Sequence, residues 1–355
     1  MTRATKARAQ RRRQAPPPPK RSPWVERGVI GLVAVAVVLV AAALWRLSGD
    51  ERVTSTADPG PVHVHGLGVN PADGALFIAT HTGLFRSVDG DPKSVRVGDS
   101  HQDTMGFAVV GENRFLGSGH PDLRTDLPPL LGLIESTDEG RSWEPISLLG
   151  EADFHVLRSA EQRVYGYDAS NDRLLVSGDA GRTWEEVERP APLVDLAAAP
   201  NDSQHVVAAG ASDLSQGLYE SRDGGRSWVS IGDRVGLLAW PAPERLFLVD
   251  GDGNVFLSSN GGGRFERRGS IGGQPAALLG QGADELFVAL HDGTIKRSTD
   301  EGATWTIRST PWPREEVRDG VPGAPRRPGL PDRDGRDDAV DDAPDAGART
   351  PRSGG

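Results

Sequence analysis

The amino-acid sequence predicts an all-β fold, a six-bladed β-propeller with a recurring turn motif, preceded by one transmembrane helix. Three observations carry this prediction. The octapeptide STDEGRSW at Ser136–Trp143 returns in similar form about every 40 residues, which is the period of a four-stranded blade. Short alternating segments rich in Val, Leu and Phe precede each return, as half-buried strands do. One run of eighteen residues without charge occupies Gly28–Trp45.

The N-terminal segment is expected to place the chain in a membrane. Residues 1–27 hold nine Lys or Arg and one acid, Glu26, and such a basic leader stays in the cytoplasm. Residues 28–45 are long enough to cross the hydrocarbon core as a helix. The competing interpretation is a cleaved signal peptide with Ala41–Ala43 as its small-residue site. The predicted location is therefore the cell membrane, single-pass with an extracytoplasmic propeller, or secretion if the apolar segment is cleaved.

The rest of the chain divides into a tether at residues 46–61, a propeller at 62–310 and a tail at 311–355. The third repeat is the clearest, with four strands expected at 155–159, 163–167, 173–177 and 183–187. Six such sheets arranged radially remove most exposed edges. The tail mixes Pro, Gly, Asp and Arg with few aliphatic residues, so we expect it to be disordered.

Each octapeptide has a structural explanation. Its Asp side chain is expected to accept hydrogen bonds from backbone N–H groups two residues on, its Gly to take a positive φ, and its Trp to pack on the neighbouring sheet. Two copies are weaker: Asn260 with Phe265, and Asp89 without a Trp. The four full copies contribute these expected structural residues: Asp138, Trp143, Asp179, Trp184, Asp223, Trp228, Asp300 and Trp305.

This octapeptide resembles the Asp-box, or BNR repeat, of sialidases, sortilin-type receptors and photosystem II assembly factor-like propellers, over about residues 62–309. Bacterial proteins of this kind are often classed as BNR-repeat glycosyl hydrolases, so the resemblance implies a glycosidase as one candidate function. The photosystem assembly resemblance implies a different one, a propeller used as a docking platform for a protein partner.

The histidines gather on one face of the predicted fold. In an antiparallel blade the start of the first strand and the end of the second lie on the face opposite the box turns. Only His205 maps to the box face; His101 lies in a loop on the other face. Since His63 and His65 are two residues apart, a regular strand would point both the same way. The expected ligand-binding residues on this face are His63, His65, His81, His120, His155 and His291.

Three interpretations of these histidines remain open. Neutral imidazoles with nearby carboxylates suit a divalent metal, with His63, His65 and His155 as candidate ligands. They also suit a pocket for a sugar or a peptide. The third interpretation is that they satisfy backbone groups of loops.

Catalysis would fall on acids of the same face. The sialidase resemblance implies a tyrosine nucleophile beside a carboxylate, and Tyr167 with Asp168 is the pair that reaches this face, with Arg124 and Arg158 as nearby arginines. The Arg-Ile-Pro signature of that family is missing. Another glycosidase chemistry would use Asp153 with Asp168, or Asp122 with Asp126, as acid and base.

Composition excludes several function classes. The chain has no cysteine, which removes disulfides, thiolate metal sites and cysteine nucleophiles. Its net charge is -10; because the leader carries +8 and the tail -2, residues 28–310 carry -16, which disfavours nucleic acid. The sequence thus predicts a membrane-anchored extracytoplasmic propeller that binds a glycan or protein ligand on its histidine-rich face. The alternative is an exo-acting, sialidase-like glycoside hydrolase that uses carboxylates of that face.

Overall fold

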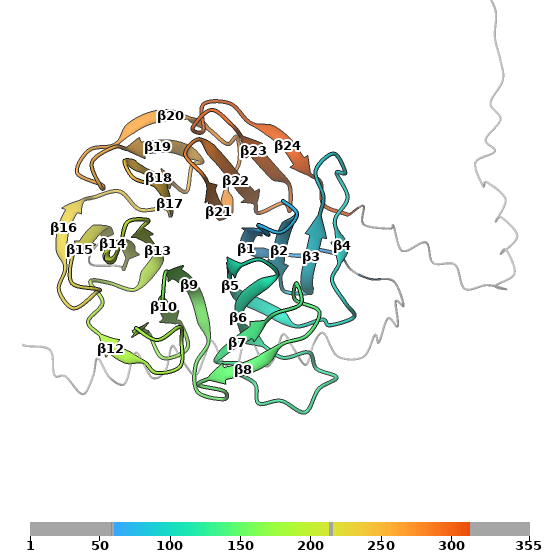
Figure 1. Ribbon diagram of the computed structural model, residues 1–355. Coiled ribbons are helices and arrows are strands. Elements are labelled where there is room, and N and C mark those ends of the chain that lie inside the picture. The colour runs from blue at the N-terminus through green and yellow to red at the C-terminus, as the bar shows by residue number, and fades with distance from the viewer. Residues whose placement is uncertain (1–57, 59, 213–215, 313–355) are drawn as a thin grey trace, which may run out of the picture. The chain divides into compact units, whose positions relative to one another are not determined.

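The computed structural model describes residues 58, 60–212 and 216–312, and these form six four-stranded antiparallel sheets arranged in a ring (Figure 1). Residues of the innermost strands line cavities along a central channel. The predicted all-β, six-bladed propeller is confirmed. Residues 1–27, 28–45 and almost all of the predicted tether and tail lie outside the described residues. Within the described ranges, no helix is long and apolar enough to cross a membrane.

Each blade is a meander of four consecutive strands, numbered here from the channel outward. Blade 1 has β1 (Val64–Val69), β2 (Leu76–Thr80), β3 (Gly83–Ser87) and β4 (Val95–Arg96). Blade 2 has β5 (Asp103–Gly111), β6 (Arg114–His120), β7 (Leu133–Ser136) and β8 (Glu144–Ser147). Blade 3 has β9 (Phe154–Ala160), β10 (Arg163–Asp168), β11 (Arg173–Ser177) and β12 (Glu185–Val187). Blade 4 has β13 (Leu193–Ala199), β14 (Asp202–Ala211), β15 (Gln216–Ser221) and β16 (Val229–Gly232). Blade 5 has β17 (Leu237–Ala242), β18 (Arg245–Val249), β19 (Asn254–Ser258) and β20 (Glu266–Ser270). Blade 6 has β21 (Pro275–Gln281), β22 (Glu285–Leu290), β23 (Ile295–Ser298) and β24 (Thr306–Ser309).

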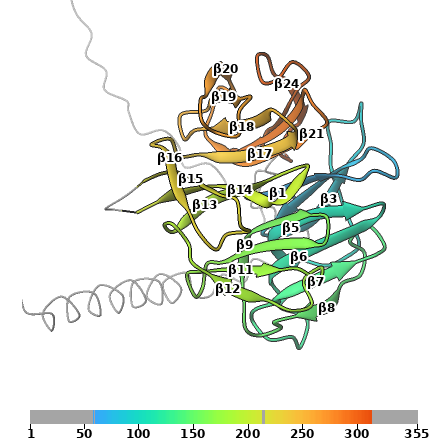
Figure 2. The ribbon, with the colours of Figure 1, turned by 60° about the vertical axis from the view of Figure 1, so that its left-hand side comes forward.

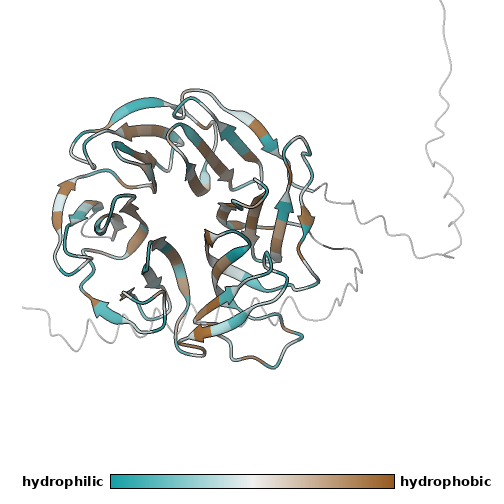
Figure 3. Cartoon of the chain, viewed as in Figure 1, coloured by the Kyte–Doolittle hydropathy of each residue, from teal (hydrophilic) through white to brown (hydrophobic). Residues whose placement is uncertain are grey.

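The hydrophobic core lies between the blades. Both faces of the middle strands are apolar because each sheet is covered by a neighbour on either side, so β2 (LFIAT) is buried at every position. Between blades 4 and 5, for example, Val207 and Leu218 pack on Leu246 and Leu248. The outermost strands mix polar and apolar residues (Figure 3) and are more exposed than the inner ones, as in β20, where most residues are exposed. Figure 2 shows the blades from the side.

The box turn of blade 3 shows why the octapeptide recurs. Asp179 Oδ1 accepts hydrogen bonds from the backbone N–H groups of Arg182 (3.1 Å) and Thr183 (2.9 Å), three and four residues on rather than the two expected. Ser177 Oγ donates to Asp179 Oδ1 and accepts from the N–H of Gly181, both at 2.8 Å. Gly181 has a φ of 87°, as its conformational role requires. The hydrogen bonds from Thr183 and Ser177 lower the pKa of Asp179 to about 2.

The box tryptophan joins neighbouring blades. Trp184 Nε1 donates to Ser147 Oγ of blade 2 at 2.9 Å, while its ring lies 4.9 Å from that of Phe154. Trp228 Nε1 donates to the carbonyl of Glu188 in blade 3 at 2.8 Å. The expected packing of the tryptophan on the adjacent sheet is therefore present, and each box stabilises an interface as well as a turn.

The weak copy in blade 5 keeps the turn with a different pair of residues. Asn260 Oδ1 accepts from Ser258 Oγ and from the N–H of Arg264, both at 2.9 Å. In blade 3, Thr183 Oγ1 also donates to Asp179 Oδ2 at 2.7 Å. Blade 5 lacks both the second carboxylate oxygen and the hydroxyl that donates to it, because Asn260 stands at the position of Asp179 and Arg264 at that of Thr183.

The ring of blades closes at the interface between blades 6 and 1. The box of blade 1 has no tryptophan to pack at this interface. Arg308 of β24 donates to Ser87 Oγ at 2.9 Å, and its Nε lies 3.4 Å from Asp89 Oδ1. Trp312 donates to the carbonyl of Ser94 at 3.1 Å and packs edge-on against Phe85, with 5.9 Å between ring centroids. The packed structure therefore reaches Trp312, two residues beyond the expected end of the propeller at 310.

Candidate functional site

A β-bulge in the innermost strand shapes one mouth of the central channel. In β1, Val64 pairs with Thr80 and Gly66 with Ala79, so His65 is the extra, unpaired residue. A bulge turns its extra side chain away from the regular alternation of the strand. The same position is extra in four further blades, at Met105, His155, Val194 and Ala276.

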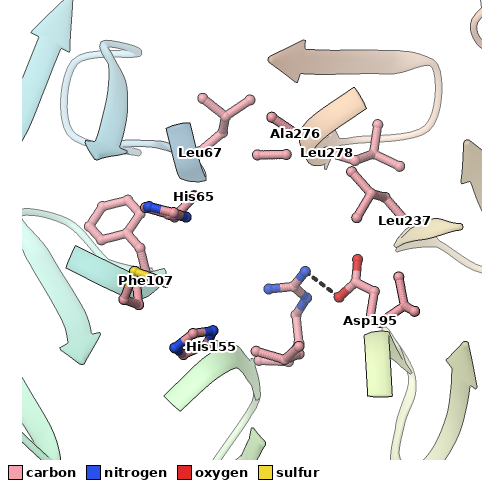
Figure 4. Close-up of a pocket in the computed structure, with 14 residues that line it drawn as sticks. His65, Leu67, Phe107, His155, Asp195, Leu237, Ala276 and Leu278 are labelled. Atoms are coloured by element: carbon pink, nitrogen blue, oxygen red, sulfur yellow. Dashed lines mark hydrogen bonds and ion pairs between the residues drawn. The ribbon is translucent and has the colours of Figure 1, made fainter. Parts of the chain in front are cut away.

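These five bulge residues line a cavity of about 150 Å³ at the channel mouth (Figure 4). In blade 5, where β17 has no bulge at this position, Leu237 lines the same cavity. A second cavity of about 290 Å³ lies further along the channel, where Trp240 and Pro241 line it. The mouth that carries the bulges is also the face to which the sequence assigned the histidines.

The two histidines of the first blade are not placed by a regular strand. His63 precedes β1 and has a φ of 53°, a left-handed conformation that is uncommon for a residue other than glycine. The regular strand on which the expected alignment of His63 and His65 depended is not present, because the bulge interrupts the alternation. Both imidazoles nevertheless contact His81, with ring centroids 5.2 and 4.3 Å away.

Asp103 of blade 2 completes this group. His81 Nδ1 lies 2.8 Å from Asp103 Oδ1, and one ligand atom from each of His65, His81 and Asp103 lies within 4.8 Å of the others. Burial and the neighbouring His81 lower the pKa of His65 to about 4. His65 is therefore a neutral imidazole at pH 7, and its buried Nε2 has no hydrogen-bond partner among the described residues.

A second polar group lies between blades 2 and 3. Asp153 Oδ2 is 2.9 Å from His155 Nε2 and 3.6 Å from His120 Nε2. Burial acts to raise the pKa of Asp153, but the His155 hydrogen bond and the two imidazoles lower it overall, while Asp153 raises the pKa of His155. Asp153 Oδ1 is buried with no hydrogen-bond partner within the described part of the chain.

We call the residues of these two groups the histidine mouth: His63, His65, His81, Asp103, His120, Asp153 and His155. It unites five of the six predicted ligand-binding histidines. Of the three predicted metal ligands, His65 lies in the Asp103 group and His155 in the Asp153 group, while the His63 ring lies against that of His81. His291 is exposed in blade 6, and its N–H donates to the carbonyl of Gln274. His205 pairs with Glu220 at 2.7 Å and packs on Trp240.

The other predicted catalytic residues are occupied by bonds within the fold. Asp168 is 0% exposed and accepts from Arg173 Nε and Asn171 Nδ2, both at 2.8 Å. The hydroxyl of Tyr167 donates to Asp172 Oδ1 at 2.6 Å, and burial together with this acidic partner raises the pKa of Tyr167 to about 12. Neither residue lines the channel cavity.

Asp122 anchors the loop that follows β6. It accepts from the N–H groups of His101 (2.8 Å) and Arg124 (2.9 Å) and forms an ion pair with the Arg124 side chain. The Arg124 hydrogen bonds hold the pKa of the Asp122 carboxyl well below its usual range. Asp126, its proposed catalytic partner, is exposed.

An ion pair that lies in the channel was not predicted from the sequence. Arg158 Nη2 lies 2.6 Å from Asp195 Oδ1 (Figure 4), and Asp195 also accepts from the N–H groups of Leu196 and Leu238. Burial raises the pKa of the Asp195 carboxyl, and Arg158 and the two N–H groups oppose that rise. The signal was present in the sequence, since an Asp interrupts the apolar run LVDLAAA of β13.

Comparisons with known proteins agree with this architecture. The family model described as "Sortilin, neurotensin receptor 3" of the Sortilin-Vps10 family matches residues 132–254. A GH74 enzyme from Niastella koreensis is 14% identical with a TM-score of 0.53, over 72% of this chain and 46% of that one. A chain of a nidogen/laminin complex is 12% identical with a TM-score of 0.53, over 67% of this chain and 93% of that one.

A third solved structure, YCF48 bound to D1 peptide, is 15% identical with a TM-score of 0.42, over 63% of this chain and 72% of that one. A comparison with curated proteins finds no match. This chain thus spans less than half of the Niastella enzyme, and such low identities show a shared fold alone. The Sortilin-Vps10 match and the two structures with a TM-score of 0.53 confirm the resemblance to Asp-box-like propellers.

Proposed function

We propose that this protein is a membrane-anchored, extracytoplasmic propeller that binds a protein ligand at the histidine mouth. The observation that carries the proposal is the buried Asp153 Oδ1, an acceptor that lacks a hydrogen-bond partner within the described residues. The other oxygen, Asp153 Oδ2, lies 2.9 Å from His155 Nε2, and His155 lines the channel cavity. A buried acceptor such as Asp153 Oδ1 costs about 1–3 kcal/mol when left unsatisfied, and a donor supplied by a ligand would remove that cost.

Size and charge favour a protein ligand over a glycan. A cavity of about 150 Å³ is smaller than the ~300–1,000 Å³ pockets that enclose drug-sized ligands, so it suits one inserted side chain. The charge of -16 on residues 28–310 would attract a basic segment. The nidogen/laminin likeness adds an example of this fold in a protein complex.

The hydrolase alternative has weaker support. A glycosidase needs two carboxyl groups about 5–10 Å apart across an open pocket. Of the predicted acids, Asp168 is fully buried and Asp122 is held by Arg124, while the cavity itself is lined by Asp195, which is paired with Arg158. The likeness to GH74 enzymes remains the reason to test hydrolysis.

The test is photocrosslinking in cells with the full-length chain. A photoreactive residue replaces Leu123, which is fully exposed in the loop after β6, and in the control it replaces Arg264 in a box turn on the opposite face. We expect a discrete protein adduct from Leu123 that Asp153→Asn removes. Equal adducts from both positions, or an adduct unaffected by Asp153→Asn, would contradict the proposal.

Two further measurements address the remaining parts of this proposal. Release of reducing sugar from any of a panel of polysaccharides by the purified full-length chain, abolished by Asp153→Asn, would favour the hydrolase. Membrane anchoring predicts that the chain sediments with membranes and is cleaved by external protease after removal of the cell wall. Recovery of the full chain in the soluble fraction would reject the anchor.

A further inference from the structure

We propose that His65, His81 and Asp103 form a binding site for a divalent transition-metal ion that prefers imidazole ligands, such as Zn²⁺ or Cu²⁺. This inference does not depend on the protein-ligand proposal, since the site is complete within blades 1 and 2. It differs from the sequence-based metal hypothesis in two of its three ligands, because the tertiary structure replaces His63 and His155 by His81 and Asp103.

The three side chains already lie at nearly the required separations. Their ligand atoms are within 4.8 Å of one another, and His81 Nδ1 is 2.8 Å from Asp103 Oδ1. A tetrahedral ion with bonds of about 2.0–2.1 Å holds its ligand atoms about 3.3 Å apart. Binding an ion would therefore require the widest of these separations to close by at most about 1.5 Å.

His65 supplies the strongest single argument. Its Nε2 is buried, and no described residue donates to it or accepts from it. Its imidazole is held edge-on against His81 with 4.3 Å between ring centroids and an interplanar angle of 79°. A buried polar atom without a protein partner calls for a bound water or ion. An imidazole nitrogen without a partner, beside a second imidazole and a carboxylate, is suited to an ion.

The backbone beside this group has two features that are common at functional sites, a positive φ and a β-bulge. His63 has a positive φ, and His65 is the extra residue of a bulge. The N–H of His81 lies within hydrogen-bonding distance of the Val62 and His63 carbonyls, at 3.1 and 3.4 Å. These features hold the segment before β1 against the end of β2, so that the ligand side chains converge.

The ligand set indicates which metals the site would take. Imidazole suits zinc, copper, iron and nickel, whereas calcium and magnesium prefer all-oxygen sites. Three protein ligands leave a fourth position for water or another group. Further candidate donors are His63, which contacts His81, and Met105 and His155, which line the cavity together with His65.

The test is metal titration of the full-length protein, purified without a histidine tag. All eight histidines lie between positions 63 and 291, so the terminal segments add none. With Zn²⁺ alone, calorimetry should show one equivalent bound. His81→Ala and Asp103→Ala should each weaken binding by more than the ~10–100-fold that loss of an outer-shell partner causes. His291→Ala, an exposed histidine outside the group, should leave binding unchanged.

A second measurement tests the metal ligands in the wild-type protein, so that it does not depend on the folding of a variant. Cu²⁺ bound to the wild type should show, by electron paramagnetic resonance, hyperfine splitting from two imidazole nitrogens. Absence of stoichiometric Zn²⁺ binding, equal loss in His291→Ala, or a copper spectrum without nitrogen ligands would overturn the proposal. The last two outcomes would leave water as the partner of His65. A result in either direction is independent of crosslinking at Leu123, because no protein ligand is present.

Discussion

Arg158 and Asp195 form an ion pair on neighbouring innermost strands, with Arg158 Nη2 2.6 Å from Asp195 Oδ1. Asp195 also accepts from the N–H of Leu238 at 2.9 Å, so one carboxylate ties blades 3, 4 and 5 together at the channel wall. The Asp195 side chain is only 3% exposed, and a charge this buried needs its partner.

We expect Arg158→Met to destabilise the fold by about 3 kcal/mol, because it leaves the Asp195 charge buried without a counter-charge. Adding Asp195→Asn to that variant should recover part of the loss, since the amide is neutral and its one oxygen still accepts from one of the two backbone N–H groups, those of Leu196 and Leu238, which bind different oxygens of Asp195. Urea denaturation of both variants measures the difference. A double variant less stable than Arg158→Met would show that the pair is not coupled in this way.

The box turn of blade 5 should accept the residues of blade 3. Asn260→Asp with Arg264→Thr recreates the Asp179–Thr183 pair, in which a hydroxyl donates to the second carboxylate oxygen. We expect the gain in the free energy of unfolding of the double variant to exceed the sum of the two single-variant changes by about 1 kcal/mol, the typical net value of one hydrogen bond. A double-mutant cycle by denaturant unfolding measures this coupling, and additive effects would argue against it.

Trp312 should act as the closing tryptophan that blade 1 lacks. Trp312→Ala removes the contact with Phe85 and the hydrogen bond to Ser94. Because Trp312 is half-buried, we expect the free energy of unfolding to fall by about 2 kcal/mol, less than the ~3–5 kcal/mol that truncation of a fully buried aromatic costs. Trp312→Phe should lose less. Ile307→Ala, at a largely exposed site on the preceding strand β24, is the control, and an equal effect there would reject the role.

The Asp153–His155 pair should make stability depend on pH. The pKa of His155 is raised in the folded state, so its contribution is complete below the unfolded value of 6.5 and is lost as pH rises through the folded pKa. The pKa of Asp153 is lowered, so its contribution is lost as pH falls below 3.8. Both groups therefore contribute fully to the free energy of unfolding only between pH 3.8 and pH 6.5.

We expect Asp153→Asn to lower the pKa of His155 because it removes the first cause of the rise. The titration of the His155 imidazole proton followed by NMR measures this pKa, and His155→Gln assigns the signal among the eight histidines. An unaltered His155 midpoint would mean that Asp153 does not stabilise the charged imidazole.

The sequence alone determined the architecture, since each repeat carries its own evidence. Short apolar segments, a turn with a fixed set of hydrogen bonds and a tryptophan at its end are local features, so the residues that form them lie within about 40 positions of one another. The face of the histidines followed as well, because antiparallel pairing fixes which strand ends share a side.

Which side chains meet was decided by the tertiary structure. The bulge at His65 depends on how β1 pairs with β2, and the approach of Asp103 to His81 depends on how two blades pack. Asp168 and Tyr167 end a strand at the correct face, but packing buries them and gives them partners within blade 3. Alternation along one strand cannot predict these outcomes, because burial and pairing at the channel arise from residues of several blades at once.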